Sequence, residues 1–280
     1  MEAWFDPDNA DYWGSQVALE PLRPAFNALS RRRILTVGDG KGAKEAVFFR
    51  SLGHHVTASD VATEVIEEAA RRGLIEHWHR ENAQNLSCED GAFDFVVTKE
   101  TLHHLPEPHL ALSEMLRVAS EGVVLIEPHY RHFSYYQMTP AMCVRRLLKH
   151  LKELFVPTRC RKHRLPFPSY EDSGNFSYRF NPYELTQVAR AMGLPAGAIG
   201  YADTFYEPGC EGITGPELED LKSRKQSEWA RRDAREGIQS RPFLVYLFFK
   251  CEMTRDFLAA LENQDFRLVN LDDRTDRTDR

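Results

Sequence analysis

Cysteine pairs are missing from this 280-residue chain: its five cysteines lie at least 17 residues apart, and none forms a Cys-x-x-Cys motif. This spacing excludes zinc sites built from cysteine pairs and favours reduced thiols in a cytoplasm. Long hydrophobic runs are missing as well, since the longest, Phe243–Phe249, is far shorter than the roughly 18 residues that span a bilayer. The N-terminal stretch is acidic and has no apolar segment, so we expect no cleaved signal peptide.

An excess of positive charge is also missing, because 36 Lys and Arg face 42 Asp and Glu, for a net charge of -6. The chain therefore lacks the overall positive charge that is typical of proteins that bind nucleic acid. A hydrophobic content of 42% predicts a globular protein with a sizeable core. We interpret residues 1–280 as a single domain. Its expected parts are a core at 30–130 and 181–251, a lid insertion at 131–180, a charged helical insertion at 214–238 and a mobile tail at 272–280.

Short apolar runs alternate with helical patterns through the first half of the chain. We expect strands at residues 33–37, 55–58, 93–97 and 123–126, and later at 199–205 and 243–249. Helical spacing of apolar residues lies between them, and a highly charged helix is expected at 216–236. Asn181-Pro182 followed by Glu184 predicts a helix start, and Gly193 its end. Alternation of this kind predicts an α/β fold, a doubly wound and mostly parallel sheet with helices on both faces.

A glycine cluster, Gly38-Asp39-Gly40-Lys41-Gly42, follows the first expected strand. Glycines there allow a tight turn and close approach of a ligand, and free N–H groups of the next helix would favour an anion. Asp60 ends the next strand, where a carboxylate can accept both hydroxyls of a ribose. The pair predicts a nucleoside-containing cofactor. The same spacing also fits a dinucleotide loop, so NAD stays an alternative, as does a plain turn.

Four segments, in order, resemble the class I S-adenosylmethionine-dependent methyltransferases of the type 11-like group. They read ILTVGDGKG, VTASD, ENAQNLSCEDGAFDFVVTKETLHHLPEP and ALSEMLRVASEGVVLIEP. The resemblance covers roughly residues 30–130. It implies a Rossmann-like sheet of seven strands whose last strand inserts antiparallel. It also implies S-adenosylmethionine as cofactor and S-adenosylhomocysteine as product.

The resemblance also assigns roles to residues. The loop would pass under the methionine part of the cofactor, and Asp60 would hold the ribose. Val61 would pack on the adenine, and Asn82-Ala83 would receive its amino group. The expected cofactor-binding residues are Gly38, Asp39, Gly40, Gly42, Asp60, Val61, Asn82, Ala83 and Lys99. Three positions depart from the family pattern. Thr36 stands where an acid usually precedes the loop, Asn82 replaces the usual aspartate, and Ser120-Glu121-Gly122 replaces the usual Pro-Gly-Gly turn before the fifth strand.

A hydroxyl acceptor needs a group that takes its proton, and histidine suits that role at neutral pH. His129, after the fifth expected strand, is our first candidate base, and His104, after the fourth, is the second. No metal is expected. A metal-assisted alternative would need His103, Glu127, His129 and Asp203 to converge, although they lack a ligand spacing.

The segment 145–164 holds eight Lys or Arg and one Glu, within an amphipathic stretch that begins at 144. It predicts a lid helix, and its basic face would suit an anionic acceptor or a peripheral membrane contact. We therefore expect an O-methyltransferase that acts on a small or glycan-type acceptor, with carbohydrate modification as one possibility. The alternatives are a cofactor-binding scaffold with weak activity and an NAD-dependent oxidoreductase.

Overall fold

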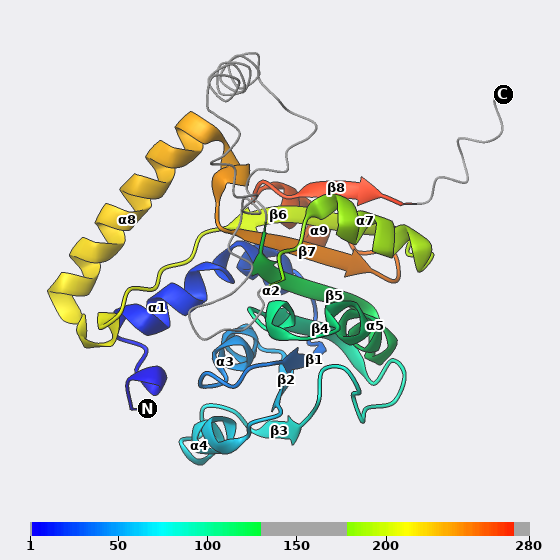
Figure 1. Ribbon diagram of the computed structural model, residues 1–280, viewed down its shortest axis with the longest axis horizontal. Coiled ribbons are helices and arrows are strands. Elements are labelled where there is room, and N and C mark those ends of the chain that lie inside the picture. Colours follow the sequence, from blue (N-terminus) through cyan, green and yellow to red (C-terminus); the bar gives the residue numbers. More distant parts are fainter. Residues whose placement is uncertain (1, 130–177, 272–280) are drawn as a thin grey trace, which may run out of the picture.

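The structure, a computed structural model, describes residues 2–129 and 178–271. Its centre is an eight-stranded sheet in the order β3-β2-β1-β4-β5-β7-β6-β8 (Figure 1). The strands are β1 (Arg33–Val37), β2 (His55–Asp60), β3 (His77–Arg80), β4 (Phe93–Lys99), β5 (Ala119–Pro128), β6 (Ala196–Ala202), β7 (Phe243–Phe249) and β8 (Arg267–Asn270). The expected α/β sheet is confirmed.

Strands β3, β2, β1, β4 and β5 run parallel to their neighbours. Strand β7 then lies antiparallel between β5 and β6, and every one of its residues is buried. This is the antiparallel insertion that the resemblance implies. Because it is buried on both faces, β7 is a continuous apolar run rather than an alternating one.

Three details of the strand prediction were wrong. The sheet has eight strands rather than seven, and two of them, β3 and β8, are missing from the strands expected above. Both are short and largely solvent-facing, so neither shows a clear apolar run in the sequence. Strand β6 begins at Ala196 and ends at Ala202, not at Phe205. The chain leaves the sheet there because Asp203 forms an ion pair with Arg232 and Phe205 packs against Trp13.

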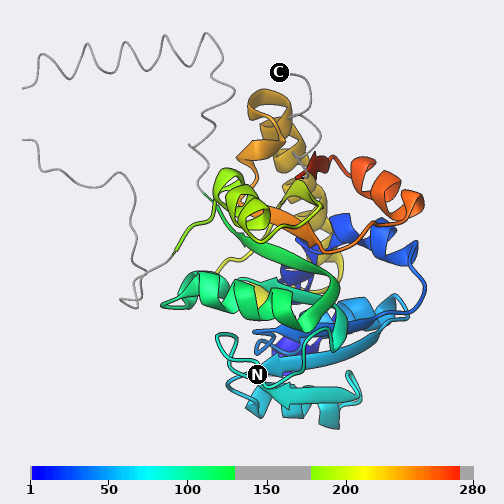
Figure 2. The same cartoon turned by 90° about the vertical axis from the view of Figure 1, so that its right-hand side faces the viewer.

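The helices cover both faces of the sheet (Figure 2). One face carries α2 (Arg23–Asn27), α3 (Lys44–Ser51), α4 (Glu64–Arg71) and α9 (Arg255–Glu262), and the other carries α5 (Pro108–Val118) and α7 (Pro182–Ala191). Short 3-10 helices lie at Glu2–Phe5, Glu20–Leu22, Leu102–His104, Cys210–Gly212 and Ile238–Ser240. Each face thus has its own apolar core.

The predicted start of α7 is confirmed in atomic detail. Asn181 Oδ1 accepts a hydrogen bond from Glu184 N at 2.8 Å, and Pro182 is the first helical residue. Gly193, with φ of +68°, follows the end of the helix. A left-handed residue at this point favours glycine, so the local sequence by itself determines both ends of α7.

The charged helix α8 (Gly215–Glu236) packs beside the N-terminal helix α1 (Ala10–Val17) (Figure 1). Leu218 and Leu221 supply its small apolar side, and Trp229 stacks on Trp13 with ring centroids 5.8 Å apart. None of the helices within residues 2–129 and 178–271 combines the length and apolar composition needed to cross a membrane.

Candidate active site

The carboxyl ends of four adjacent strands bring the predicted site segments to one edge of the sheet. Val37, the last residue of β1, is in register with Ser59 of β2 and with Thr98 of β4. Lys99, at the end of β4, is in register with Ile126 of β5. Ligands of α/β sheets bind at such an edge. The glycine loop, Asp60 and the segments after β4 and β5 therefore meet here.

Two side chains rest directly on the glycine loop. Gly38 has φ of +80°, and a Cβ built on it would lie 2.1 Å from Thr101 Oγ1. A Cβ on Gly40 would lie 2.6 Å from Asp60 Oδ2. Distances this short exclude any side chain at either position without movement of the neighbours. The two residues that sequence reasoning paired, Gly40 and Asp60, are in close contact.

Asp39 lies beneath the loop and caps α3. Its carboxylate accepts hydrogen bonds from the backbone N–H groups of Glu45 (3.2 Å) and Ala46 (2.8 Å), and from Thr36 Oγ1 (2.8 Å). The expectation that the first N–H groups of this helix bind an anionic ligand was therefore wrong, because Asp39 already occupies those donors. Asp39 thus holds the glycine loop to Thr36 at the end of β1 and to the first turn of α3.

A buried charge network continues from Asp39 through Glu45 to Lys99. Lys99 Nζ lies 3.1 Å from Glu45 Oε1 and 3.0 Å from Glu100 Oε2. Burial raises the pKa of Asp39, and the neighbouring Glu45 raises it further. Burial alone would also raise the pKa of Glu45, but the charge of Lys99 and hydrogen bonds with Asp39 and Lys99 together outweigh it and lower that pKa to about 2. Asp39 and Lys99, both predicted site residues, therefore stabilise the glycine loop from its buried side.

Helix α1 is fastened to the glycine loop by a carboxylate that sequence reasoning did not assign. Asp11 Oδ2 lies 2.6 Å from Lys44 Nζ, and Asp11 Oδ1 lies 3.0 Å from Lys41 Nζ. The side chains of Asp11 and Lys44 are 3% and 2% exposed. The only local signal is an acid in the first turn of a helix capped by Asn9. The two lysines are 30 and 33 positions from Asp11 in the sequence, so no local pattern predicts the contact.

The residues expected near the adenine lie on the β2 and β3 side of the site. Asp60 Oδ1 accepts a hydrogen bond from Ala62 N at 2.8 Å, and Val61 is 56% exposed. Asn82 is exposed, and its Oδ1 accepts a hydrogen bond from Gln84 N at 3.0 Å. Ala83, in contrast, is buried in the core on the α5 face. Val61 and Asn82 are thus accessible to a ligand, whereas the Ala83 side chain is a core residue.

A histidine and a glutamate form a buried pair where β5 ends. His103 Nδ1 lies 2.6 Å from Glu127 Oε2, and the Glu127 side chain has no exposed surface. Glu127 Oε1 accepts hydrogen bonds from the backbone N–H groups of Thr101 (2.9 Å) and Leu102 (2.7 Å). Since a carboxylate accepts, Nδ1 carries a proton and the lone pair of neutral His103 is on Nε2. Sequence reasoning named this pair only as metal-ligand candidates.

The two predicted catalytic histidines flank this pair. His104 is exposed, and its ring lies 3.8 Å from the His103 ring, centroid to centroid. His129 is buried, its Nε2 lies 2.8 Å from the carbonyl oxygen of Arg241, and its ring lies 5.1 Å from that of Tyr201. Because a carbonyl accepts, Nε2 of His129 carries a proton, and any role as a base would involve Nδ1.

The four candidate metal ligands do not all converge. His103 meets Glu127, but Asp203 forms a two-pronged ion pair with Arg232, at 2.6 and 3.0 Å. The basic segment 145–164 and all but the last three residues of the expected lid at 131–180 lie outside the described residues, as does the tail at 272–280.

Comparison with known proteins agrees with this architecture. Residues 35–126 match the family model described as a methyltransferase domain. A ubiquinone biosynthesis O-methyltransferase of Xanthomonas oryzae is 31% identical over 131 residues, which cover 42% of this chain and 52% of that protein. The protein of the same name from Haemophilus ducreyi is 29% identical over 151 residues, 49% of this chain and 63% of that one.

A solved structure shows the same fold. It is a chain in the Haloferax volcanii complex of a methyltransferase activator with a presumed methyltransferase. The two chains share 12% identity with a TM-score of 0.50, over 88% of this chain and 94% of that one.

The sheet order, the glycine loop with its acid after β2, and the family match together define the class of protein. Residues 35–126 match a methyltransferase domain, and the sheet around them is similar to that of the class I S-adenosylmethionine-dependent methyltransferases. The chain spans about half the length of the first of the curated relatives described above, with 52% of that protein covered.

Proposed function

We propose that this chain is an S-adenosylmethionine-dependent O-methyltransferase that acts on a hydroxyl group of a small molecule. The observation that carries the proposal is the His103–Glu127 pair beside the glycine loop. Thr101 joins the two parts, because its backbone N–H donates to Glu127 and its Oγ1 lies 3.4 Å from Gly38 O. The curated relatives described above, which are named as O-methyltransferases, support the same reaction class.

The residues at the edge suit the cofactor of the family. Gly38 and Gly40 leave the backbone accessible where any side chain would collide, and Asp60 lies against the loop with a carboxylate for ribose hydroxyls. Exposed Val61 and Asn82 are the residues that would contact the adenine. When bound, S-adenosylmethionine supplies a methyl group activated by its sulfonium.

The loop suits NAD less well. Dinucleotide-binding loops bind the pyrophosphate with the N–H groups at the start of the following helix. In this chain the N–H groups of Glu45 and Ala46 donate to the Asp39 carboxylate. A pyrophosphate would have to displace this buried acid from both donors.

His103 is the group that we propose to take the acceptor proton. Glu127 fixes the tautomer, so that the Nε2 lone pair accepts the proton while Nδ1–H remains bonded to the carboxylate. The imidazolium that forms is then stabilised by the buried carboxylate beside it. His129 and His104, the residues first predicted from the sequence, remain candidates for orienting the acceptor or for ordering the loop.

Calorimetric titration with S-adenosylmethionine, S-adenosylhomocysteine and NAD tests the cofactor assignment. We expect 1:1 binding of the first two and none of NAD. Methyl transfer to a panel of small phenols and other hydroxyl compounds then tests the reaction. Tight cofactor binding with no turnover on any member of the panel, glycans included, would instead favour the scaffold alternative.

The proposed preference for an anionic acceptor comes from the basic segment alone. Exposed charges are screened over about 8 Å at physiological salt, so the acceptor KM should rise with ionic strength while cofactor affinity changes little. Replacing Arg159, Arg161, Lys162 and Arg164 with Gln should raise KM in the same way. Gln substitutions of the exposed Arg224, Arg231 and Arg235 on α8 are the matched control. An unchanged KM in the first set refutes the anionic preference.

A further inference from the structure

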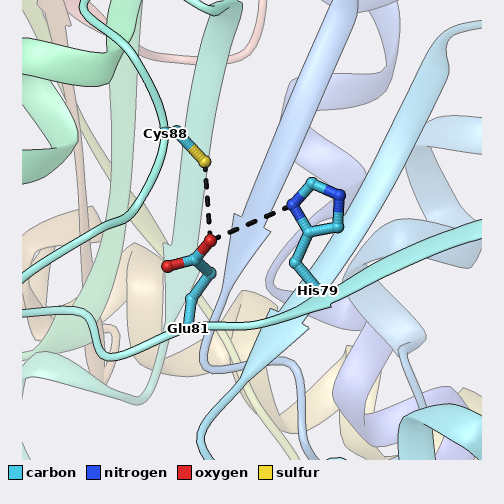
Figure 3. A group of neighbouring side chains, drawn as sticks. All are labelled: His79, Glu81 and Cys88. Carbon is cyan, nitrogen blue, oxygen red and sulfur yellow. Dashed lines mark hydrogen bonds and ion pairs between the residues drawn. The ribbon is translucent and has the colours of Figure 1, made fainter.

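Three side chains of metal-ligating type come together beside the edge strand β3. His79 belongs to β3, Glu81 follows its last residue, and Cys88 lies in the loop that leads to β4. Figure 3 shows His79 and Cys88 approaching the same oxygen of the Glu81 carboxylate from two sides. His79 Nδ1 lies 3.9 Å from Glu81 Oε1, and Cys88 Sγ lies 3.7 Å from the same atom.

The spacing of the three donor atoms fits one small cation. All three lie within 4.8 Å of one another. A point at equal distance from them is no more than about 2.5 Å from each, whereas zinc bonds to nitrogen, oxygen and sulfur measure about 2.0–2.3 Å. Inward movements of a few tenths of an ångström would therefore complete three bonds.

The carboxylate is already oriented for this role. Glu81 is buried, and Ser87 holds it with two hydrogen bonds, one from its backbone N–H to Oε2 (2.8 Å) and one from its hydroxyl to Oε1 (2.6 Å). A carboxylate oxygen has two lone pairs, so Oε1 can accept from Ser87 and bind a cation at once. Hydrogen bonds of this kind typically orient the ligands of metal sites.

The pleat of β3 explains why these residues face one another. Trp78 packs against the core on the α3 and α4 face of the sheet, so its neighbour His79 lies on the opposite side of the strand. Cys88 packs against the core on the α5 face, which is that same side. The His79 side chain is 52% exposed, so a fourth ligand position would open to water.

We propose that His79, Glu81 and Cys88 form a zinc site with water as the fourth ligand. A thiolate, an imidazole and a carboxylate are the mixed donors that zinc accepts in tetrahedral geometry, whereas magnesium and calcium prefer oxygen alone. Binding would join the end of β3 to the loop that precedes β4. Asn82 follows Glu81 directly, so the ion would also stiffen the chain at the expected adenine contact.

Zinc affinity of the full chain, measured by competition with a chromophoric chelator, tests the proposal. We expect one zinc ion bound, and at least about 100-fold weaker binding in Cys88→Ser and in His79→Ala, since loss of a direct ligand should exceed the 10–100-fold effect of losing an outer-shell partner. Ser87→Ala, which removes one such outer hydrogen bond, should weaken binding by about 10–100-fold. Cys251→Ser and His77→Ala are matched controls, because both residues are exposed and outside the cluster.

Cobalt(II) in place of zinc gives an independent reading. A thiolate-to-cobalt absorption band should appear in the parent and in Cys251→Ser, and should be absent in Cys88→Ser. Because His79 is half exposed, His79→Ala should fold even if Cys88→Ser does not, and circular dichroism checks both. A parent that binds no zinc, or that binds it no more tightly than both variants, overturns the proposal.

Discussion

Glu127 Oε2 lies 2.6 Å from His103 Nδ1, and both side chains are buried where β5 meets the segment after β4. The second oxygen of the same carboxylate accepts from two backbone N–H groups of that segment. One carboxylate thus orients the imidazole and holds the turn that carries it. Through Thr101, this segment also contacts the glycine loop.

Changing Glu127 to Gln should reduce turnover by about 10²–10⁴, because an amide nitrogen placed at His103 would favour the wrong tautomer. Cofactor affinity should change little, since glutamine keeps an oxygen that can accept from the backbone N–H groups of Thr101 and Leu102. The measurement is kcat alongside calorimetric binding of S-adenosylmethionine. Retained turnover in both Glu127→Gln and His103→Ala would exclude this pair from the mechanism. His129→Ala and His104→Ala, tested in parallel, would then identify the base.

Changing Asp60 to Ala should weaken binding of S-adenosylmethionine, because charge-assisted hydrogen bonds of this kind contribute roughly 1.5–3 kcal/mol each. The Asp60 carboxylate lies against Gly40, where no other described acid is as close. Glu64→Ala, an exposed acid at the start of α4, is the control and should bind normally. Equal dissociation constants for parent and Asp60→Ala would show that the assignment of Asp60 to the ribose is wrong.

Gly38→Ala and Gly53→Ala form a matched pair. Both glycines have positive φ, +80° and +88°, but a Cβ at Gly38 would collide with Thr101, whereas one at Gly53 meets nothing within 4 Å. Gly53→Ala should lower the free energy of unfolding by about 1–2 kcal/mol through backbone strain. Gly38→Ala should lower it by a further 1–3 kcal/mol or so from overpacking. Urea denaturation measures both, and equal losses would contradict the close contact at Gly38.

Asp11→Asn should lower the free energy of unfolding at pH 7 by about 3 kcal/mol, because it leaves Lys44 charged and buried without its acid. Burial by itself would raise the pKa of Asp11, but hydrogen bonds and charge from Lys44 and Lys41 outweigh it and lower that pKa. The ion pair therefore stabilises the fold above the ordinary pKa of an aspartate and loses its effect as the pH falls through the lowered value.

The stability difference between parent and Asp11→Asn should consequently begin to shrink near pH 4 and disappear only below the lowered pKa of Asp11. Thermal unfolding across pH 2–7 follows this convergence. Glu20→Gln, which breaks an exposed ion pair with Arg23, should have little effect at any pH and serves as the control. A constant difference between parent and Asp11→Asn over the whole range would show that charge is not the cause.

The sequence by itself determined the elements whose signals are local. Apolar runs located β1, β4, β5 and β7, and the Asn181-Pro182 start and Gly193 end located α7. The glycine loop and Asp60 were also predicted, because a strand, a tight turn and an acid after the next strand follow one another within residues 33–60. The edge strands β3 and β8 were not predicted, since short, solvent-facing strands carry no apolar run.

Only the tertiary structure decided which side chains meet across long separations. Asp11 and Lys44 are 33 positions apart, and His103 and Glu127 are 24 apart, so no periodicity relates them. Their pairing follows from burial, because a charge removed from water needs a partner. Parallel strand ends bring Glu127 beside the segment of His103, whereas the packing of α1 against α3 brings Asp11 to Lys44. Asp39 is buried as well, and it finds its partners in the N–H groups at the start of α3. Patterns along the chain predict where the backbone turns, whereas the partner of a buried charge depends on what the fold packs against it.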